Sequence, residues 1–214
     1  MTRASGRKSI FITGAASGIG AETARYFAKR GWFCGLYDVN TAGLDAVEAE
    51  IGSENCLKAR LDVRNREDWA AAIKDFSEAT EGAMNVLFNN AGIGRHGWFE
   101  DITGEDNDAI IDINVKGVVN GVQASLSLLK ATSGARIVNT ASTAGVVRSP
   151  QLAVYSATKF AVRGLPEALD AELRDTDIRA TSLMPWIIAT PVTQLRERAH
   201  STPQMPDQPQ HDRM

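Results

Sequence analysis

Short apolar runs alternate along the chain with segments that have the period of a helix. The apolar runs predict strands at residues 9–13, 32–37, 56–61, 85–88, 136–140 and 179–183. Apolar positions three and four residues apart predict helices at 18–30, 41–51, 65–79, 103–130 and 152–175. The strands are continuous apolar runs, which indicates burial on both faces. We therefore expect a doubly wound α/β fold, with a mostly parallel sheet of about six strands between helices.

The end of the chain breaks this alternation. Residues 201–214 contain no aromatic or β-branched aliphatic side chain and are rich in Gln, Pro and Asp. Such a segment cannot bury enough apolar surface to offset the entropy lost on ordering. We expect a single domain over residues 1–200, beginning with a loose basic arm, and a disordered polar tail over 201–214.

Composition and charge exclude several classes of function. A chain of 214 residues that is 43% apolar suits one globular domain with a full core. The net charge of −3 and the pI of about 5.7 give no basic surface for nucleic acid. No apolar run approaches the roughly 20 residues that span a bilayer, and the first residues lack the apolar part of a secretory signal. We expect a cytoplasmic protein without nucleic-acid or membrane partners.

The cysteines and histidines suggest neither a disulfide nor a metal centre. Cys34 and Cys56 lie in predicted strands, where small buried thiols in a reducing compartment are the ordinary interpretation. His96, His200 and His211 lack the spacing of metal ligands. We therefore expect no metal site.

A glycine-rich turn, Thr13-Gly14-Ala15-Ala16-Ser17-Gly18-Ile19-Gly20, joins the first predicted strand to the first predicted helix. Gly14 permits a tight turn, Gly18 lets backbone approach a pyrophosphate, and Gly20 allows the helix to pack closely on the strand. Phosphates would lie at the helix N-terminus, where free N–H groups favour anions. Taken alone, the motif leaves open an ordinary glycine-rich turn between a strand and a helix.

Asp38 follows the second predicted strand, about 20 residues after the glycines. An acidic side chain at this distance accepts hydrogen bonds from the adenosine ribose. It would also repel the 2′-phosphate of NADP, and the glycine turn contains no Arg or Lys to offset that repulsion. We therefore favour NAD(H) over NADP(H). The alternative is that Asp38 only caps the next helix.

A second candidate site lies in the last predicted helix, at Tyr155-Ser156-Ala157-Thr158-Lys159. Tyr155 and Lys159 are four residues apart and share a helix face. A nearby ammonium lowers the pKa of a phenol, which then exchanges a proton with a substrate oxygen near neutral pH. Such a pair alone is usually a solvated helix face. Ser142 favours the catalytic alternative, because it follows the fifth strand, where parallel sheets open into a ligand crevice.

These motifs together resemble the short-chain dehydrogenase/reductase family over residues 8–190. The glycine turn is similar to the family's T-G-x-x-x-G-I-G motif, and Asp62-Val63 to its adenine-binding pair. Asn89-Asn90-Ala91-Gly92 is similar to its N-N-A-G element. The family's catalytic tetrad is matched by Asn114, Ser142, Tyr155 and Lys159. The resemblance implies a Rossmann-like, dinucleotide-binding catalytic domain.

The resemblance also implies a role for each member of the tetrad. Tyr155 would be the general acid/base on the substrate oxygen, and Lys159 would lower its pKa and hold the nicotinamide ribose. Ser142 would hydrogen-bond the substrate carbonyl or alcohol, and Asn114 would hold a water that links Lys159 to solvent. The implied enzyme is an NAD(P)-dependent oxidoreductase, with NAD favoured, that transfers a hydride between NAD(H) and a secondary alcohol or ketone.

Cofactor contacts, pocket residues and assembly follow from the same resemblance. The expected cofactor-binding residues are Gly14, Ser17, Gly18, Ile19, Gly20, Asp38, Asp62, Val63, Asn90, Ala91, Gly92, Tyr155, Lys159, Pro185 and Thr190. Candidate residues of the substrate pocket are Gly94, Arg95, His96, Trp98, Val146, Val147, Leu152 and Trp186. The family pairs its two long helices across a subunit interface, so we expect a homodimer or homotetramer.

Three departures from the family pattern bear on function. Trp186 replaces the Gly of the family's P-G-x-x-x-T motif, so its ring must point away from the cofactor or narrow the pocket. Pro166 interrupts the helix of Tyr155 and costs about 3 kcal/mol unless the helix kinks. After Thr190 only residues 191–200 could form a short helix, and we expect the substrate lid and the seventh strand of the family to be missing.

Two other functions stay open. The first is an NAD-binding family member with little or no catalysis, which Trp186 and the missing lid would favour. The second is an epimerase or dehydratase that holds NAD tightly and uses the same Tyr–Lys chemistry, although such relatives carry a larger substrate domain. The identity of the substrate cannot be inferred from the sequence.

Overall fold

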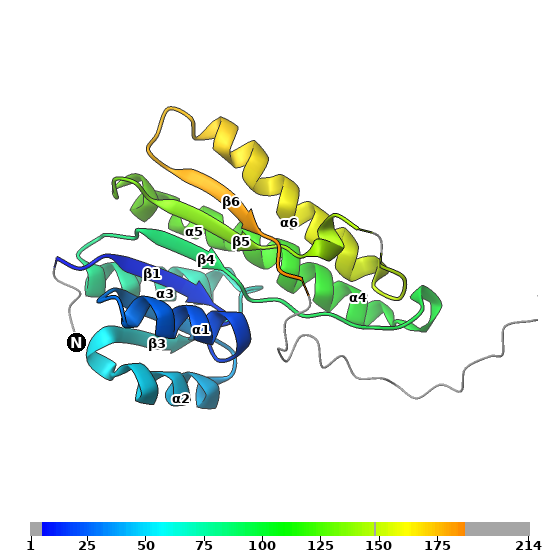
Figure 1. The fold of residues 1–214 in the computed structure, drawn as a ribbon, viewed down its shortest axis with the longest axis horizontal. Coiled ribbons are helices and arrows are strands. Elements are labelled where there is room, and N and C mark those ends of the chain that lie inside the picture. The colour runs from blue at the N-terminus through cyan, green and yellow to red at the C-terminus, as the bar shows by residue number, and fades with distance from the viewer. Residues whose placement is uncertain (1–5, 148, 187–214) are drawn as a thin grey trace, which may run out of the picture.

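The computed structural model describes residues 6–147 and 149–186. Its six described strands form one parallel sheet in the order β3-β2-β1-β4-β5-β6 (Figure 1). The strands are β1 (Ser9–Thr13), β2 (Phe33–Asp38), β3 (Cys56–Arg60), β4 (Val86–Asn89), β5 (Arg136–Thr140) and β6 (Arg179–Leu183). The order reverses between β1 and β4, and ligands bind beside the carboxyl ends of the strands at such a reversal. The doubly wound α/β fold expected from the sequence is confirmed.

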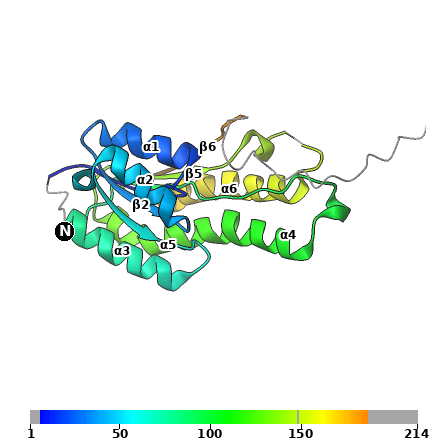
Figure 2. The same cartoon turned by 90° about the horizontal axis from the view of Figure 1, so that it is seen from below.

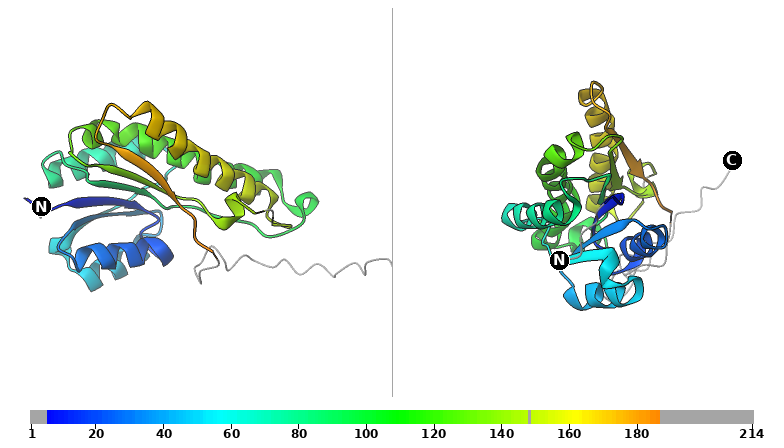
Figure 3. Two further views of the ribbon diagram at one scale, coloured as in Figure 1. Left: turned by 45° about the horizontal axis from the view of Figure 1, so that its top comes forward. Right: turned by 90° about the vertical axis from the view of Figure 1, so that its left-hand side faces the viewer.

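Helices cover both faces of the sheet (Figures 2 and 3). One face carries α1 (Gly18–Ala28) and α2 (Thr41–Ile51). The other face carries α3 (Arg66–Thr80), α4 (Gly104–Ile111), α5 (Gly117–Lys130) and α6 (Ala153–Glu172). Short 3₁₀ helices lie at η1 (Ser53–Asn55), η2 (Phe99–Asp101) and η4 (Thr143–Gly145). In the part of the chain that the structure describes, no helix is both long and apolar enough to cross a membrane.

The alternating side chains of β1 divide the core into two layers. Ile10 and Ile12 pack with α1 and α2, whereas Phe11 packs in the layer under α3 and α5. The Phe11 ring stacks on Tyr37 with its centroid 3.9 Å away, and on Trp69 at 5.4 Å. Burial on both faces, expected from the apolar run, is therefore observed for β1.

The same expectation is wrong for β6. Arg179, Thr181 and Leu183, which alternate along β6 and share one face of the sheet, are exposed, because among the described helices α6 packs on the strand from the other face. The other predicted boundaries coincide with the observed ones or differ by one or two residues, as helix and strand ends commonly do, except that α6 ends at Glu172 rather than at 175. The possible helix at 191–200 and the predicted tail at 201–214 lie outside the described residues.

The predicted long helix over 103–130 is present, but one of its turns is not an α turn. The helix consists of α4, then a π-helical turn, η3 (Asp112–Lys116), and then α5, with helical backbone at each junction. A π turn contains one residue more than an α turn, so it shifts the register of the side chains that follow. The turn contains the predicted site residue Asn114, and the hydrogen bonds of this side chain stabilise the turn.

Pro166 lies inside α6, yet the helix continues through it. A proline has no N–H to donate, so the carbonyl of Val162, one turn earlier, loses its helical partner. The hydroxyl of Ser182 on β6 donates to this carbonyl at 3.2 Å. The sheet therefore supplies the hydrogen bond that the proline removes, and no break in the helix is needed.

This compensation predicts coupled effects of Ser182 and Pro166 on stability. Ser182→Ala should lower the free energy of unfolding by about 1–2 kcal/mol, because the buried carbonyl of Val162 loses its donor. In a Pro166→Ala background the same change should cost less than about 0.5 kcal/mol, because residue 166 then supplies an N–H. Urea unfolding of the four proteins measures both costs. Equal costs in the two backgrounds would contradict the compensation.

Candidate active site

The glycine turn between β1 and α1 has a backbone that requires glycine. Gly14 and Gly18 have φ angles of +68° and +53°, which side chains other than glycine rarely adopt. A Cβ on Gly20 would overlap the carbonyl oxygen of Gly14. A Cβ on Gly14 would lie 2.9 Å from the Cα of Ala91, on the loop after β4. The tight turn and the close helix packing predicted for Gly14 and Gly20 are both present.

The N-terminus of α1 differs from those of the three helices that follow. Asn40, Asn65 and Thr103 each cap their helix with a side-chain oxygen. Ser17 makes no such bond, and the first turn of α1 contains no acidic residue. Its N–H groups are therefore without a side-chain acceptor, which is the environment that phosphate oxygens favour.

Asp38 joins the end of β2 to the glycine turn. Its carboxylate accepts from the N–H of Ala16 at 3.1 Å and from the N–H of Asn40 at 2.9 Å. The residue that caps α2 is Asn40, so the alternative role of Asp38 as the helix cap is wrong. Across the ladder Asp38 is the partner of Arg60 on β3, a cation that only strand register could have revealed.

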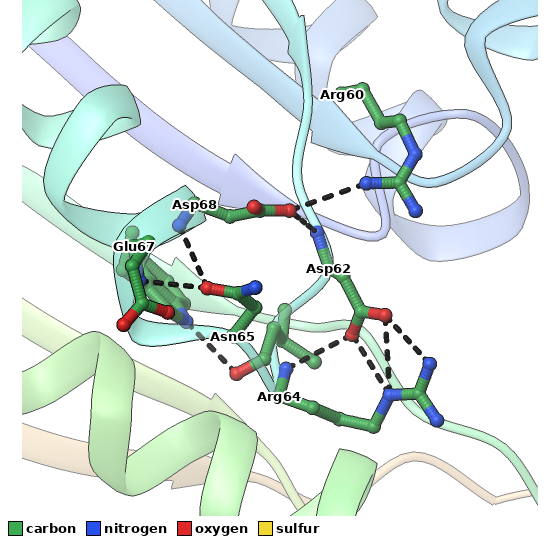
Figure 4. Close-up of polar contacts among 8 residues, drawn as sticks. Arg60, Asp62, Arg64, Asn65, Glu67 and Asp68 are labelled. Carbon is green, nitrogen blue, oxygen red and sulfur yellow. Dashed lines mark hydrogen bonds and ion pairs between the residues drawn. The ribbon is translucent and has the colours of Figure 1, made fainter.

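Asp62, which is labelled in Figure 4, and Val63 lie shortly after β3, in the loop that leads to α3. The carboxylate of Asp62 is bound by Arg64, with Nη2 2.6 Å from Oδ2. The carbonyl of Val63 accepts from Trp69 Nε1 at 3.0 Å and from Asn120 Nδ2 at 3.1 Å. This predicted adenine-binding pair is therefore held at the carboxyl end of the sheet, next to Asp38.

The side chain of Asn90 links the ends of three strands by hydrogen bonds, at the point where the strand order reverses. Its Nδ2 donates to the carbonyls of Thr13 at 3.1 Å and Gly14 at 3.3 Å. Its Oδ1 accepts from the hydroxyl of Thr140, at the end of β5, at 3.1 Å. Thr13 Oγ1 in turn accepts from the N–H groups of Asn90 and Ala91. The ends of β1, β4 and β5 are thus held in a fixed relation.

Asn114, in the π turn, connects the loop after β4 to α6. Its Oδ1 accepts from the N–H of Ile93 at 2.9 Å, and its Nδ2 donates to the carbonyl of Ile93 at 2.9 Å. The same Nδ2 donates to Thr158 Oγ1 at 3.1 Å. Asn114 is buried, so these bonds satisfy an amide that would otherwise be costly to bury. The π turn brings this side chain to both partners.

Lys159 is almost fully buried beside Gly92 and Tyr155. It is 4% exposed, and its Nζ donates to the carbonyl of Thr140 at 2.7 Å. A Cβ on Gly92 would lie 3.5 Å from that Nζ, so the N-N-A-G element lies against the lysine. Desolvation by burial lowers the pKa of Lys159 to about 8. The Nζ lies 5.5 Å from the centroid of the Tyr155 ring.

The environment of Tyr155 raises the pKa of its phenol, whereas the sequence predicts a lowered pKa. Burial raises the pKa of Tyr155, and a hydrogen bond from Ser142 opposes that shift without overcoming it. The i, i+4 spacing of Tyr155 and Lys159 predicts a lowered pKa, but the desolvation of the ring is not visible in the sequence. The structure nevertheless brings Ser142, Tyr155 and Lys159 together at the carboxyl end of β5.

Of the candidate pocket residues, Arg95 shares the lining of a small cavity with Tyr155. Arg95 donates to Asp106 at 2.9 Å, so its charge is already paired. Trp98, Val146 and Val147 are exposed, and Trp186 is 69% exposed, so its ring does not fill an interior pocket. The same cavity adds residues that the sequence analysis did not single out. These are Gly97, Phe99, Ile102, Asn107, Ile110, Gln151, Ala153 and Val154.

The remaining predicted residues are placed as follows. The carbonyl of Pro185 accepts from the N–H of Thr143 at 3.1 Å, which puts Pro185 beside Ser142. Thr190 lies outside the described residues. Over residues 6–147 and 149–186, no three His, Cys, Asp or Glu side chains are grouped closely enough to hold a metal ion.

The burial of Lys159 predicts a variant that is more stable but impaired in the site. Lys159→Met should raise the free energy of unfolding at pH 7 by about 1–3 kcal/mol, because a buried ammonium with a lowered pKa opposes folding. Between pH 8 and 10.5 the unfolded chain holds a proton that the folded chain lacks, so the stability of the unsubstituted protein rises through this range. The advantage of the Met variant should therefore shrink by pH 10.

Urea unfolding at pH 7 and pH 10 measures this difference for the two proteins. A Met variant that is less stable at pH 7 would contradict the cost assigned to the buried charge. An advantage of the same size at both pH values would contradict it too.

The sequence of this chain is similar to those of known oxidoreductases. A family model described as short chain dehydrogenase matches residues 8–201. Oxidoreductase UcpA of Escherichia coli K12 is 37% identical over 202 residues, which cover 94% of this chain and 76% of that protein.

Two solved structures share the fold. A short chain dehydrogenase/reductase from Burkholderia phymatum in complex with NAD has a TM-score of 0.84 and 32% identity, covering 92% of this chain and 74% of that chain. An alcohol dehydrogenase from Thermococcus sibiricus, complexed with 5-hydroxy-NADP, has a TM-score of 0.79 and 29% identity, covering 85% and 77%. The chain belongs to the short-chain dehydrogenase/reductase family of oxidoreductases.

Proposed function

We propose that this protein catalyses hydride transfer between NAD(H) and a secondary alcohol or ketone, with Tyr155 as the general acid/base. The observation that carries the proposal is the cluster of Ser142, Tyr155 and Lys159 at the carboxyl end of β5. The same edge of the sheet carries the glycine turn and Asp38. A proton-transfer group and a dinucleotide site are therefore neighbours across the point where the strand order reverses.

The described residues fit a dinucleotide along this edge. The uncapped first turn of α1 would hold the phosphates, and Asp38 would accept from the adenosine ribose. Asp62 and Val63 would lie beside the adenine base of the cofactor. The residues expected toward the nicotinamide are Asn90, Ala91, Gly92, Tyr155, Lys159, Pro185 and Thr190. When bound, the nicotinamide supplies or accepts the hydride.

The side chains of the protein handle the proton. Burial raises the pKa of Tyr155 above the ordinary value of a phenol, so the side chain carries a proton that it can donate to the oxygen of a ketone. Lys159, whose pKa of about 8 leaves it mostly charged at pH 7, stabilises the phenolate that this donation creates. The hydroxyl of Ser142 would bond the same substrate oxygen. Oxidation of an alcohol uses these steps in reverse.

NAD is proposed over NADP because of the charge beside the ribose. Both oxygens of Asp38 already accept backbone N–H groups, which fixes a negative charge at the position of a 2′-phosphate. Arg60, its neighbour across the ladder, is paired with Asp68 at 3.3 Å. The available cation is therefore partly neutralised before a cofactor binds.

A homodimer or homotetramer and a cytoplasmic location complete the proposal. Ile111 on α4 and Phe160 on α6 are exposed apolar side chains on two helices that pack against each other, which supports a subunit interface formed by these helices. The thiols of Cys34 and Cys56 are free and buried, as is usual in a reducing compartment.

Turnover with a panel of ketones tests the proposal. Purified protein should oxidise NADH in the presence of at least one secondary ketone, with kcat/KM for NADH at least about tenfold above that for NADPH. Tyr155→Phe should lower kcat by about a hundredfold or more, because general acid/base groups contribute that much. The absorbance of reduced nicotinamide follows the reaction.

Binding of NADH to the Phe variant is the control for a folded cofactor site. A protein that binds NADH but turns over no ketone or alcohol would contradict the proposed activity and favour binding without catalysis. Full activity in the Phe variant would contradict the role of Tyr155.

A further inference from the structure

Asp62 lies where the base of a bound dinucleotide would end. The strands β1, β2 and β3 are consecutive across the sheet, and their carboxyl ends carry the glycine turn, Asp38 and Asp62 in the same order. The N–H of Leu61 donates to the carbonyl of Asp38 at 3.1 Å, so the loop after β3 is fixed beside the predicted ribose site. A nucleotide with phosphate at the turn and ribose at Asp38 directs its base toward Asp62.

The guanidinium of Arg64 donates hydrogen bonds to both carboxylate oxygens of Asp62 (Figure 4). Its Nε lies 2.9 Å from Oδ1 and 3.2 Å from Oδ2, and its Nη2 lies 2.6 Å from Oδ2. The backbone N–H of Arg64 also donates to Oδ1, at 3.1 Å. An ionised carboxylate has about four acceptor sites, so these contacts use most of its capacity. They also lower the pKa of Asp62, which keeps it ionised.

The loop holds the two side chains in this arrangement. The N–H of Asp62 donates to Asp68 Oδ2 at 2.9 Å, and its carbonyl accepts from the N–H of Asn65 at 2.9 Å. Asn65 in turn caps α3 by accepting from the N–H groups of Glu67 and Asp68. The backbone of Asp62 is thus fixed to the first turn of a helix. Its side chain is 17% exposed, whereas that of Arg64 is 47% exposed.

We propose that Arg64 determines how this site recognises the base, by occupying the acceptor that the 6-amino group of adenine would use. The inference rests on the proposed binding of NAD(H). A 6-amino group donates hydrogen bonds, and a carboxylate already filled by a guanidinium accepts them poorly. A 6-oxo group, as in hypoxanthine, accepts instead, and the exposed part of the Arg64 guanidinium can donate to it. The site therefore tolerates either base.

Paired binding measurements test this directly. Dissociation constants of NADH and of its hypoxanthine analogue, deamino-NADH, are measured by calorimetry on the full chain. For the unsubstituted protein the two constants should agree within about threefold. Arg64→Gln should raise the preference for NADH to about tenfold or more, because a freed carboxylate gains a charge-assisted hydrogen bond from the 6-amino group.

Two further variants identify the source of the change. Arg60→Gln also removes one positive charge from this loop. The Arg60 side chain is paired with Asp68 rather than with Asp62, so the ratio of the two dissociation constants should stay within about threefold. Adding Asp62→Ala to Arg64→Gln should return the ratio to that of the unsubstituted protein.

The outcomes separate this inference from the proposed function. NADH binding with a ratio that changes by less than about threefold in Arg64→Gln would overturn the inference alone, as would a preference for NADH above about threefold in the unsubstituted protein. Absence of NADH binding to the unsubstituted protein would overturn the proposed function, and the inference with it.

Discussion

The buried side-chain amide of Asn114 is the contact on which the geometry of the candidate site depends. It binds both backbone groups of Ile93 and the hydroxyl of Thr158. The loop after β4, the π turn and α6 are therefore tied together by one side chain. Each of these groups would cost about 1–3 kcal/mol if it were left buried without a partner, so the arrangement is strongly specified.

The consequences of this contact reach the reacting groups through α6. Thr158 donates its hydroxyl to the carbonyl of Tyr155 at 2.7 Å, and the next residue is Lys159. The Nζ of Lys159 donates to the carbonyl of Thr140 at the end of β5 and lies beside Gly92 in the loop after β4. These contacts hold the ammonium of Lys159 in a buried position, where its desolvation lowers the stability of the fold. Such a loss of stability in favour of activity is common at active sites.

Much of this architecture could be predicted from the sequence, because local patterns determine it. The apolar run of β1, the glycine turn and the i, i+4 spacing of Tyr155 and Lys159 are each visible in a short stretch of chain. Membership of the short-chain dehydrogenase/reductase family follows from several such stretches in the same order, and the family model confirms it.

The features that could not be predicted depend on contacts between distant residues. The periodicity of 103–130 does not distinguish a π turn from an α turn, since the turn is stabilised by the partners of Asn114. The tolerance of Pro166 needs Ser182 on another element. The direction of the pKa shift of Tyr155 requires its burial, and the neighbourhood of Asp38 and Arg60 requires strand register.

The measurement that tests this account most directly is the pH profile of kcat/KM for ketone reduction in Thr158→Val and Thr158→Ser. The Val variant keeps the shape of the side chain but removes both hydrogen bonds of the hydroxyl. We expect it to lose about tenfold or more in kcat/KM, with a shifted pH profile and NADH affinity within about threefold of normal, because small displacements of reacting groups are costly. The Ser variant should keep most of the activity and the original profile. A Val variant with unchanged kcat/KM and pH profile would contradict the central place given to the Asn114 contact.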